Sequence, residues 1–188
     1  GEERVLLIDA DLRKPQTHAL VRVKRVPGLS DVIVGKVKPS EAIHERVPES
    51  RLAYLAAGAT APSTADILTT RTMRILLDGL RGFYYWIVID SPPVGAVDEP
   101  MILAPLADFV IKVEGSHMLP RKAETHTLER LHDTGARILG IVLNRAQVER
   151  HSYYYGHYYG HYYGKYGNSG DRDTPNSKVT NIASRRRA

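Results

Sequence analysis

Residues 4–15 read RVLLIDADLRKP, and this stretch indicates the fold. A short run of aliphatic and β-branched side chains ends abruptly in charged residues, which is the pattern of a strand buried on both faces of a parallel sheet. Residues 86–93 read WIVIDSPP and repeat the pattern. Each of these predicted strands ends in an aspartate, Asp9 in the first and Asp90 in the second.

The rest of the chain alternates between strand and helix patterns. Short apolar runs predict three further strands, at 52–56, 109–113 and 138–143. Helical spacing of apolar side chains predicts helices over 63–81 and 120–132. This alternation predicts an α/β domain with a mostly parallel sheet and helices on both faces. Because such sheets bind ligands at the carboxyl ends of their strands, Asp9 and Asp90 are the first candidate site residues.

The net charge of +5 belongs to the C-terminal segment. Residues 1–144 contain 18 basic and 18 acidic side chains, whereas residues 145–188 contain 8 and 3. Eight of the 11 tyrosines lie in the second segment, in a four-residue repeat. Glycine at every fourth position of this repeat disfavours a helix. We therefore interpret 1–144 as the folded domain and 145–188 as a disordered basic tail.

Composition also restricts the function classes. The chain has no cysteine, which excludes disulfide scaffolds, cysteine-ligated zinc and thiol catalysis. No apolar run reaches the roughly 18 residues that a transmembrane helix needs. Nucleic-acid binding through Arg185–Arg187 and the tyrosines is not expected, because the domain before them is neutral. A metal site at His151, His157 and His161 is a weak alternative, because these residues lie in the flexible repeat.

The first strand end has the side chains of a metal-phosphate site. Asp9 and Asp11 are two residues apart and offer the oxygen ligands that Mg²⁺ prefers. Arg13 places positive charge beside them, which suits a phosphoryl group. Asp90, at the tip of a second apolar strand, would add a further carboxylate. A solvated charge cluster is the alternative for one motif alone, and the presence of two such strand ends disfavours it.

These stretches resemble the Walker A′ and Walker B motifs of the bacterial tyrosine kinases, the autokinases of the polysaccharide co-polymerase family. Three further segments are similar to that family, PGLSDVIVG at 27–35, GATAPSTADIL at 58–68 and ILGIVLN at 138–144. The resemblance covers about residues 3–167 and implies a P-loop NTPase-like fold. The family's P-loop, G-x-x-x-x-G-K-[ST], does not occur in the 188 residues. We therefore expect the first strand, P-loop and first helix upstream of Gly1, and no productive ATP binding by this chain alone.

The resemblance implies an ATP-dependent protein-tyrosine autokinase that regulates capsular or exopolysaccharide synthesis and export. Mg²⁺ and ATP would be its cofactors, with Asp9, Asp11 and Asp90 at the metal and one of the first two accepting the tyrosine proton. Arg13 would stabilise phosphate charge, and Asp98 would organise the loop after the second strand or cap a helix. The expected cofactor-binding residues are Asn144, Pro92 and Pro93. The expected phospho-acceptors are Tyr153, Tyr154, Tyr155, Tyr158, Tyr159, Tyr162, Tyr163 and Tyr166.

The resemblance also implies partners. Copies of the chain would phosphorylate one another within an oligomer, and a membrane co-polymerase segment, fused or separate, would hold them at the inner face of the bacterial membrane. A phosphotyrosine phosphatase would reverse the modification. Two alternatives stay open, a related P-loop ATPase switch of the septum-site or partition type (MinD or ParA), and a non-catalytic phospho-acceptor or assembly module.

Overall fold

The structure is a computed structural model of the 188-residue chain. It describes residues 4–48, 50–60, 68–116 and 121–146. The chain divides into two units, residues 1–145 and 146–188, and the fold below belongs to the first. The predicted tail and its tyrosines at 153–166 lie outside the described residues, so the division into a folded domain and a disordered tail stays a prediction.

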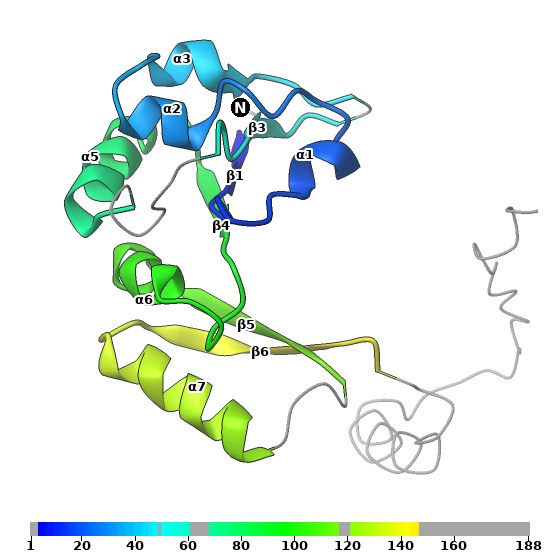
Figure 1. The fold of residues 1–188 in the computed structure, drawn as a ribbon, viewed down its shortest axis with the longest axis vertical. Helices are drawn as coiled ribbons and strands as arrows, with labels where there is room; N and C mark the ends of the chain where they lie inside the picture. The colour runs from blue at the N-terminus through cyan, green and yellow to red at the C-terminus, as the bar shows by residue number, and fades with distance from the viewer. Residues whose placement is uncertain (1–3, 49, 61–67, 117–120, 147–188) are drawn as a thin grey trace, which may run out of the picture. The chain divides into compact units, whose positions relative to one another are not determined.

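A four-stranded sheet lies among helices α1, α2, α3 and α5, whose bounds follow below (Figure 1). Its order is β2-β3-β1-β4, with β1 at Val5–Asp9, β3 at Ala53–Leu55 and β4 at Trp86–Asp90 running parallel. The two-residue strand β2, Ile43–His44, pairs antiparallel with β3 at one edge. The strands predicted at 4–9, 52–56 and 86–90 are therefore confirmed, in one mostly parallel sheet.

A second, two-stranded sheet follows in the chain. Strands β5, Val110–Gly115, and β6, Ile138–Asn144, pair in parallel and are joined through helix α7, Arg121–Asp133 (Figure 1). The predicted strands and helix of this region are confirmed. The sequence patterns favoured one continuous sheet, whereas among the described residues the strands form two separate sheets.

The longest helix before this βαβ unit is α5, Thr70–Leu80. It begins later than the predicted 63–81, because Thr69 is extended and its side chain accepts a hydrogen bond from the Thr72 amide. Residues 61–67, and with them the start expected at Pro62 and Ser63, lie outside the described residues. Four shorter helices were not predicted, namely α1 at Thr17–Leu20, α2 at Leu29–Ile33, α3 at Pro39–Ala42 and the 3₁₀ helix η1 at Ala104–Leu106. The helix α6, Glu99–Leu103, begins after Asp98, for which a helix cap was one of two interpretations.

The core lies on both faces of β1 and β3. On one face Leu6 and Ile8 pack with Leu55, Met73 and other apolar side chains of the main cluster. On the other face a smaller cluster consists of Val47, Tyr54 and Ala56, with Leu7, Val21, Val23 and Leu52 against it. Because side chains alternate along a strand, Asp9 points to the same side as Leu7 and thus toward the smaller cluster.

The expected burial on both faces is wrong for the other parallel strands. Large apolar side chains are exposed on β4, β5 and β6, among them Trp86, Val88, Ile111, Val113, Leu139 and Val142. We call these six residues the exposed strand set. On β4 the two faces differ, because side chains alternate along a strand: Ile87 and Ile89 pack against the main cluster, whereas Trp86 and Val88 point to the exposed face. None of the described helices is long and apolar enough to cross a bilayer.

Candidate functional site

The carboxyl ends of β1 and β4 bring two aspartates together. The parallel register places Asp9 opposite Asp90, and the Ala10 amide donates to the Asp90 carbonyl oxygen at 2.8 Å. Asp9 is fully buried, whereas Asp90 is exposed. The two strand ends predicted to form a site are thus adjacent.

Asp9 is held through both carboxylate oxygens. Its Oδ1 accepts from the Asp11 amide at 3.2 Å, and its Oδ2 accepts from the Tyr54 hydroxyl at 3.3 Å. Burial raises the pKa of Asp9, the Asp11 amide opposes this, and the charge of Asp90 raises it further. The pKa of Tyr54 is raised as well, by burial and by the charge of Asp9. The site therefore holds a buried carboxylate that two hydrogen-bond donors stabilise, beside the second carboxylate of Asp90.

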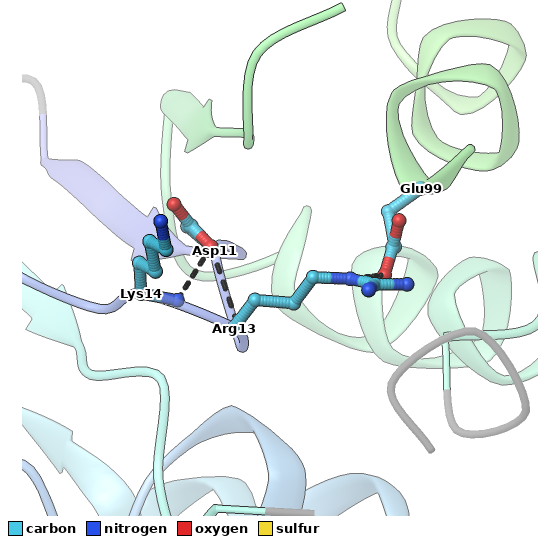
Figure 2. Close-up of polar contacts among 4 residues, drawn as sticks. All are labelled: Asp11, Arg13, Lys14 and Glu99. Carbon is cyan, nitrogen blue, oxygen red and sulfur yellow. Dashed lines mark hydrogen bonds and ion pairs between the residues drawn. The ribbon is translucent and has the colours of Figure 1, made fainter. Parts of the chain in front are cut away.

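Asp11 shapes the turn that leaves β1 (Figure 2). Its Oδ1 accepts from the backbone amides of Arg13 and Lys14, at 3.2 and 2.9 Å. This is the local side-chain to backbone bonding by which aspartate stabilises turns. The half-buried carboxylate of Asp11 is consequently fixed beside the two strand ends.

Arg13 is paired with a residue that the sequence did not single out. Its Nε donates to Glu99 Oε1 at 2.7 Å, and Glu99 is buried at the first position of α6 (Figure 2). No sequence pattern connects positions 86 residues apart. The only signal was the neighbouring Asp98, which the sequence linked to a helix start.

Asp98 does stand at the N-cap position of α6, but its side chain makes no capping hydrogen bond there. It accepts instead from Arg130 Nη2 of α7 at 2.7 Å. The two neighbouring acids at the start of α6 therefore reach two different segments.

The loop beyond β4 carries the next predicted residues. Asp90 Oδ2 accepts from the Thr17 hydroxyl at 3.0 Å, which joins β4 to the start of α1. Pro92 is buried and Pro93 is exposed in the loop that follows. Thr17 and Tyr54 were missed because neither lies in a recognisable motif. The one available signal for Tyr54 was its place in the strand predicted at 52–56.

Asn144 lies at the end of β6, in the other sheet. Its side-chain Oδ1 accepts from the Arg145 amide at 2.8 Å, and its carbonyl oxygen accepts from the Ser116 amide. No contact among the described residues joins Asn144 to the aspartates. The structure thus places Asp9 beside Asp90, with the Asp11 amide bound to Asp9, and no hydrogen bond or ion pair in the described part of the chain joins Asn144 to them.

The donor set of the strand ends fits a hard cation. The described part of the chain contains no group of three or more His, Asp or Glu side chains that could hold a metal alone. Magnesium is commonly bound through one or two carboxylates together with water and substrate phosphates. The adjacent, mutually repelling carboxylates of Asp9 and Asp90 suit this kind of site.

Comparison with known proteins identifies the family. CapB of Staphylococcus aureus is 30% identical over 156 residues, which cover 81% of this chain and 68% of CapB. The chain belongs to the bacterial tyrosine-protein kinase family. The tyrosine-protein kinase YwqD of Bacillus subtilis is 31% identical, over 81% of this chain and 64% of YwqD. Comparison with family models finds no match.

Solved structures place this kinase-family chain in the P-loop NTPase-like fold. The VpsO kinase domain matches with a TM-score of 0.72 and 32% identity, over 77% of this chain and 71% of that domain. The kinase domain of Escherichia coli ETK matches with a TM-score of 0.72 and 27% identity, over 76% of this chain and 55% of that domain. MinD of Pyrococcus horikoshii, complexed with Mg-ADP, matches with a TM-score of 0.62 and 24% identity, over 77% of this chain and 60% of MinD. This likeness concerns the fold alone.

The chain spans only part of several relatives. It corresponds to 64% of YwqD and to 21% of EpsB from Ralstonia solanacearum. The activity, substrates and partners of a whole protein are therefore matters of proposal for this chain.

Proposed function

We propose that this chain provides the Walker A′ and Walker B side of the Mg-ATP site in a protein-tyrosine autokinase. The observation that carries the proposal is the pairing of Asp9 and Asp90 at adjacent carboxyl ends of parallel strands, with the Asp11 turn beside them. Membership in the tyrosine-kinase family supports the same chemistry.

The carboxylates have two tasks in this proposal. Asp9, Asp11 and Asp90 would hold Mg²⁺ through carboxylate oxygens, and the ion would partly neutralise the charge of the γ-phosphoryl group of ATP. A tyrosine hydroxyl has a pKa near 10 and must lose its proton as its oxygen attacks the γ-phosphorus. Asp9 or Asp11 accepts that proton, a bond forms between the tyrosine oxygen and the γ-phosphorus, and the bond to the bridging oxygen breaks, so that ADP leaves with that oxygen.

Arg13 supplies positive charge at the phosphates. The Glu99 carboxylate binds its Nε, and the Arg13 side chain is half exposed, so the pair holds a cation at the edge of the turn. A fixed charge stabilises the developing transition state without having to reorganise during the reaction. Glu99 is thus a positioning residue for Arg13.

The remaining predicted residues keep their proposed roles. Asn144 contacts the adenine, and Pro92 and Pro93 stiffen the loop on the nucleotide side. Tyr153, Tyr154, Tyr155, Tyr158, Tyr159, Tyr162, Tyr163 and Tyr166 are the phospho-acceptors, reached in trans by another copy of the chain. Several acceptors in a row raise the local concentration of hydroxyl groups at a neighbour's site.

The proposed setting is capsule or exopolysaccharide export at the inner face of the bacterial membrane. A Klebsiella pneumoniae relative is named for the cps region, which supports the process. The chimerical protein CapA2B2 matches with a TM-score of 0.71 at 28% identity, over 76% of this chain and 62% of the chimera, and its chimerical make-up supports a partner segment. We propose a membrane co-polymerase segment as that partner and a phosphotyrosine phosphatase as the opposing enzyme.

The test measures phosphotyrosine in the product of the whole reading frame that encodes residues 1–188. We expect incubation with [γ-³²P]ATP and Mg²⁺ to label tyrosines between 153 and 166, located by mass spectrometry. Asp9→Asn and Asp90→Asn should abolish labelling. Asp78→Asn, at an exposed position of α5, is the matched control and should leave labelling unchanged.

Two other results of this experiment would favour the alternative functions, an ATPase switch or a phospho-acceptor module. No phosphotyrosine in the presence of ATP hydrolysis favours a P-loop ATPase switch. Labelling only by an added active kinase favours a phospho-acceptor module. The 188-residue chain alone is expected to remain unlabelled, and labelling of that chain would contradict the expected need for an upstream P-loop.

A further inference from the structure

Tyr54 lies next to the candidate metal site without belonging to either motif. The parallel register pairs Leu7 of β1 with Tyr54 of β3. Asp9 is two residues beyond Leu7 and therefore on the same face of the sheet. A long side chain can reach such a diagonal neighbour on the adjacent strand. The phenol of Tyr54 does so, and its hydroxyl donates to Asp9 Oδ2 at 3.3 Å.

The ring of Tyr54 is fixed by its surroundings. It is fully buried and belongs to the smaller core cluster, between Val47 and Ala56. On the outer side it stacks with His44, with ring centroids 6.5 Å apart and planes at 23°. A ring packed in this way has little freedom to swing its hydroxyl away from the carboxylate.

Asp9 is consequently oriented by two donors from different segments. The Asp11 amide binds Oδ1 and Tyr54 binds Oδ2. Each carboxylate oxygen has more than one acceptor direction, so both oxygens can still bind a cation. Groups that orient a ligand in this way commonly change metal affinity by about 10- to 100-fold when they are removed.

We propose that Tyr54 is a positioning residue for the divalent cation, holding the Asp9 carboxylate in the orientation that binds Mg²⁺. The inference rests on the proposed function, since it takes Asp9 as a metal ligand. The distance of 3.3 Å is long for an O–H···O hydrogen bond, so we expect an effect at the lower end of the usual range.

The test compares Tyr54→Phe with Tyr84→Phe in the product of the whole reading frame that encodes residues 1–188. Tyr84 is also a buried tyrosine whose hydroxyl donates to a carboxylate, that of Glu45 at 3.2 Å, and it is therefore a matched control. Binding is measured with Mn²⁺ as the probe, by the loss of the free-ion signal in electron paramagnetic resonance. We expect Tyr54→Phe to raise the Kd for Mn²⁺ by about 10-fold and Tyr84→Phe to leave it unchanged. Asp9→Asn should abolish the site.

The outcomes separate this inference from the proposed function. If the wild-type product of the whole reading frame binds no Mn²⁺, or if its Asp9→Asn variant binds as the wild type does, both the proposed metal site and the role of Tyr54 are overturned. If Asp9→Asn loses binding but Tyr54→Phe retains it, only the role of Tyr54 is overturned. Equal weakening in Tyr54→Phe and Tyr84→Phe would likewise reject a specific role.

A second measurement requires no substitution at Tyr54. In wild-type protein with ¹³C-labelled tyrosine rings, bound Mn²⁺ should broaden the Tyr54 resonances strongly and those of Tyr84 weakly. Equal broadening of the two rings would overturn the inference. Chemical denaturation of the phenylalanine variants tests whether a change in Kd accompanies a loss of folding stability, and we expect Tyr54→Phe to weaken Mn²⁺ binding without unfolding the chain.

Discussion

Asp9 carries its charge where burial and the neighbouring Asp90 both oppose ionisation. The pKa of Asp9 in the folded state lies above the ordinary value of 3.8. At a pH between the unfolded-state and folded-state pKa, folding is therefore accompanied by uptake of a proton. The contribution of Asp9 to the free energy of unfolding is therefore greatest at acid pH, and it falls as the pH rises through the folded-state pKa. A carboxylate placed to bind a cation in this way lowers the free energy of unfolding of the protein while no cation is bound.

We expect Asp9→Asn to raise the free energy of unfolding at pH 7 in the absence of divalent ions, and to raise it less at pH 4. The reason is that asparagine keeps a hydrogen-bond acceptor for Tyr54 or Asp11 but carries no charge. Urea denaturation at the two pH values measures the difference. The exposed variant Asp78→Asn should show no comparable gain, and a gain in Asp9→Asn that does not depend on pH would contradict the charge argument.

Gly28 and Gly79 should respond oppositely to the same substitution. A Cβ at Gly28 would overlap the backbone of Ala56 and Gly58, where the Leu29 amide donates to the Ala56 carbonyl at 2.7 Å. Gly79 lies within α5, and a Cβ there meets open space. We expect Gly28→Ala to lose about 1–3 kcal/mol of unfolding free energy and Gly79→Ala to gain up to about 1 kcal/mol. Thermal and chemical denaturation check both signs, and a stable Gly28→Ala would show that the two loops can separate.

Sequence patterns located Asp9 and Asp90 because an apolar run fixes where a strand ends. They did not locate Tyr54 or Glu99, whose partners are set by strand register and by packing between distant segments. Composition and periodicity describe neighbours along the chain, whereas these two contacts join positions 45 and 86 residues apart.

Among the helices, α5 shows how one side chain sets a boundary. Apolar spacing predicted a helix but not its first residue, which depends on the Thr69 side chain accepting from the Thr72 amide at 3.3 Å. The helices α1, α2 and α3 have four or five residues each, too few to show helical periodicity. The strands were predictable because their apolar runs are short, dense and rich in β-branched residues.

We expect Thr69→Ala to cost about 1 kcal/mol of unfolding free energy, because the cap hydrogen bond at the start of α5 is lost. Thr69→Ser retains a hydroxyl and should recover most of that loss. Denaturation curves for the two variants provide the measurement. Equal stability of the alanine and serine variants would mean that the cap hydrogen bond contributes nothing.

In the molecule as a whole, the two sheets leave apolar surface on β4, β5 and β6, the exposed strand set defined above. Exposed apolar strands with unpaired edges are sites of association. Sequence patterns could not foresee this, because a dense apolar run indicates that a strand is suited to burial but not which segment covers it.

We expect the 188-residue chain to bind a hydrophobic dye and to associate as its concentration rises. Val113→Lys should reduce both effects, since Val113 is 62% exposed at the centre of β5. Ile75→Lys on α5 is the control, because Ile75 is similarly exposed, at 64%, but lies on a helix outside this surface. Dye fluorescence and sedimentation velocity measure the outcome, and an equal response of the two variants would assign association to general hydrophobicity.

Two neighbouring acidic residues anchor the start of α6, and their ion pairs differ in exposure to solvent. Glu99 is buried and binds Arg13, whereas the Asp98 side chain is exposed where it binds Arg130 of α7. Dissolved salt screens exposed charges strongly and buried ones weakly. Rising ionic strength therefore weakens the contact between Asp98 of α6 and Arg130 of α7, while the contact between Glu99 and Arg13 persists. The link between the carboxylate site and the β5-α7-β6 unit consequently depends on the salt concentration.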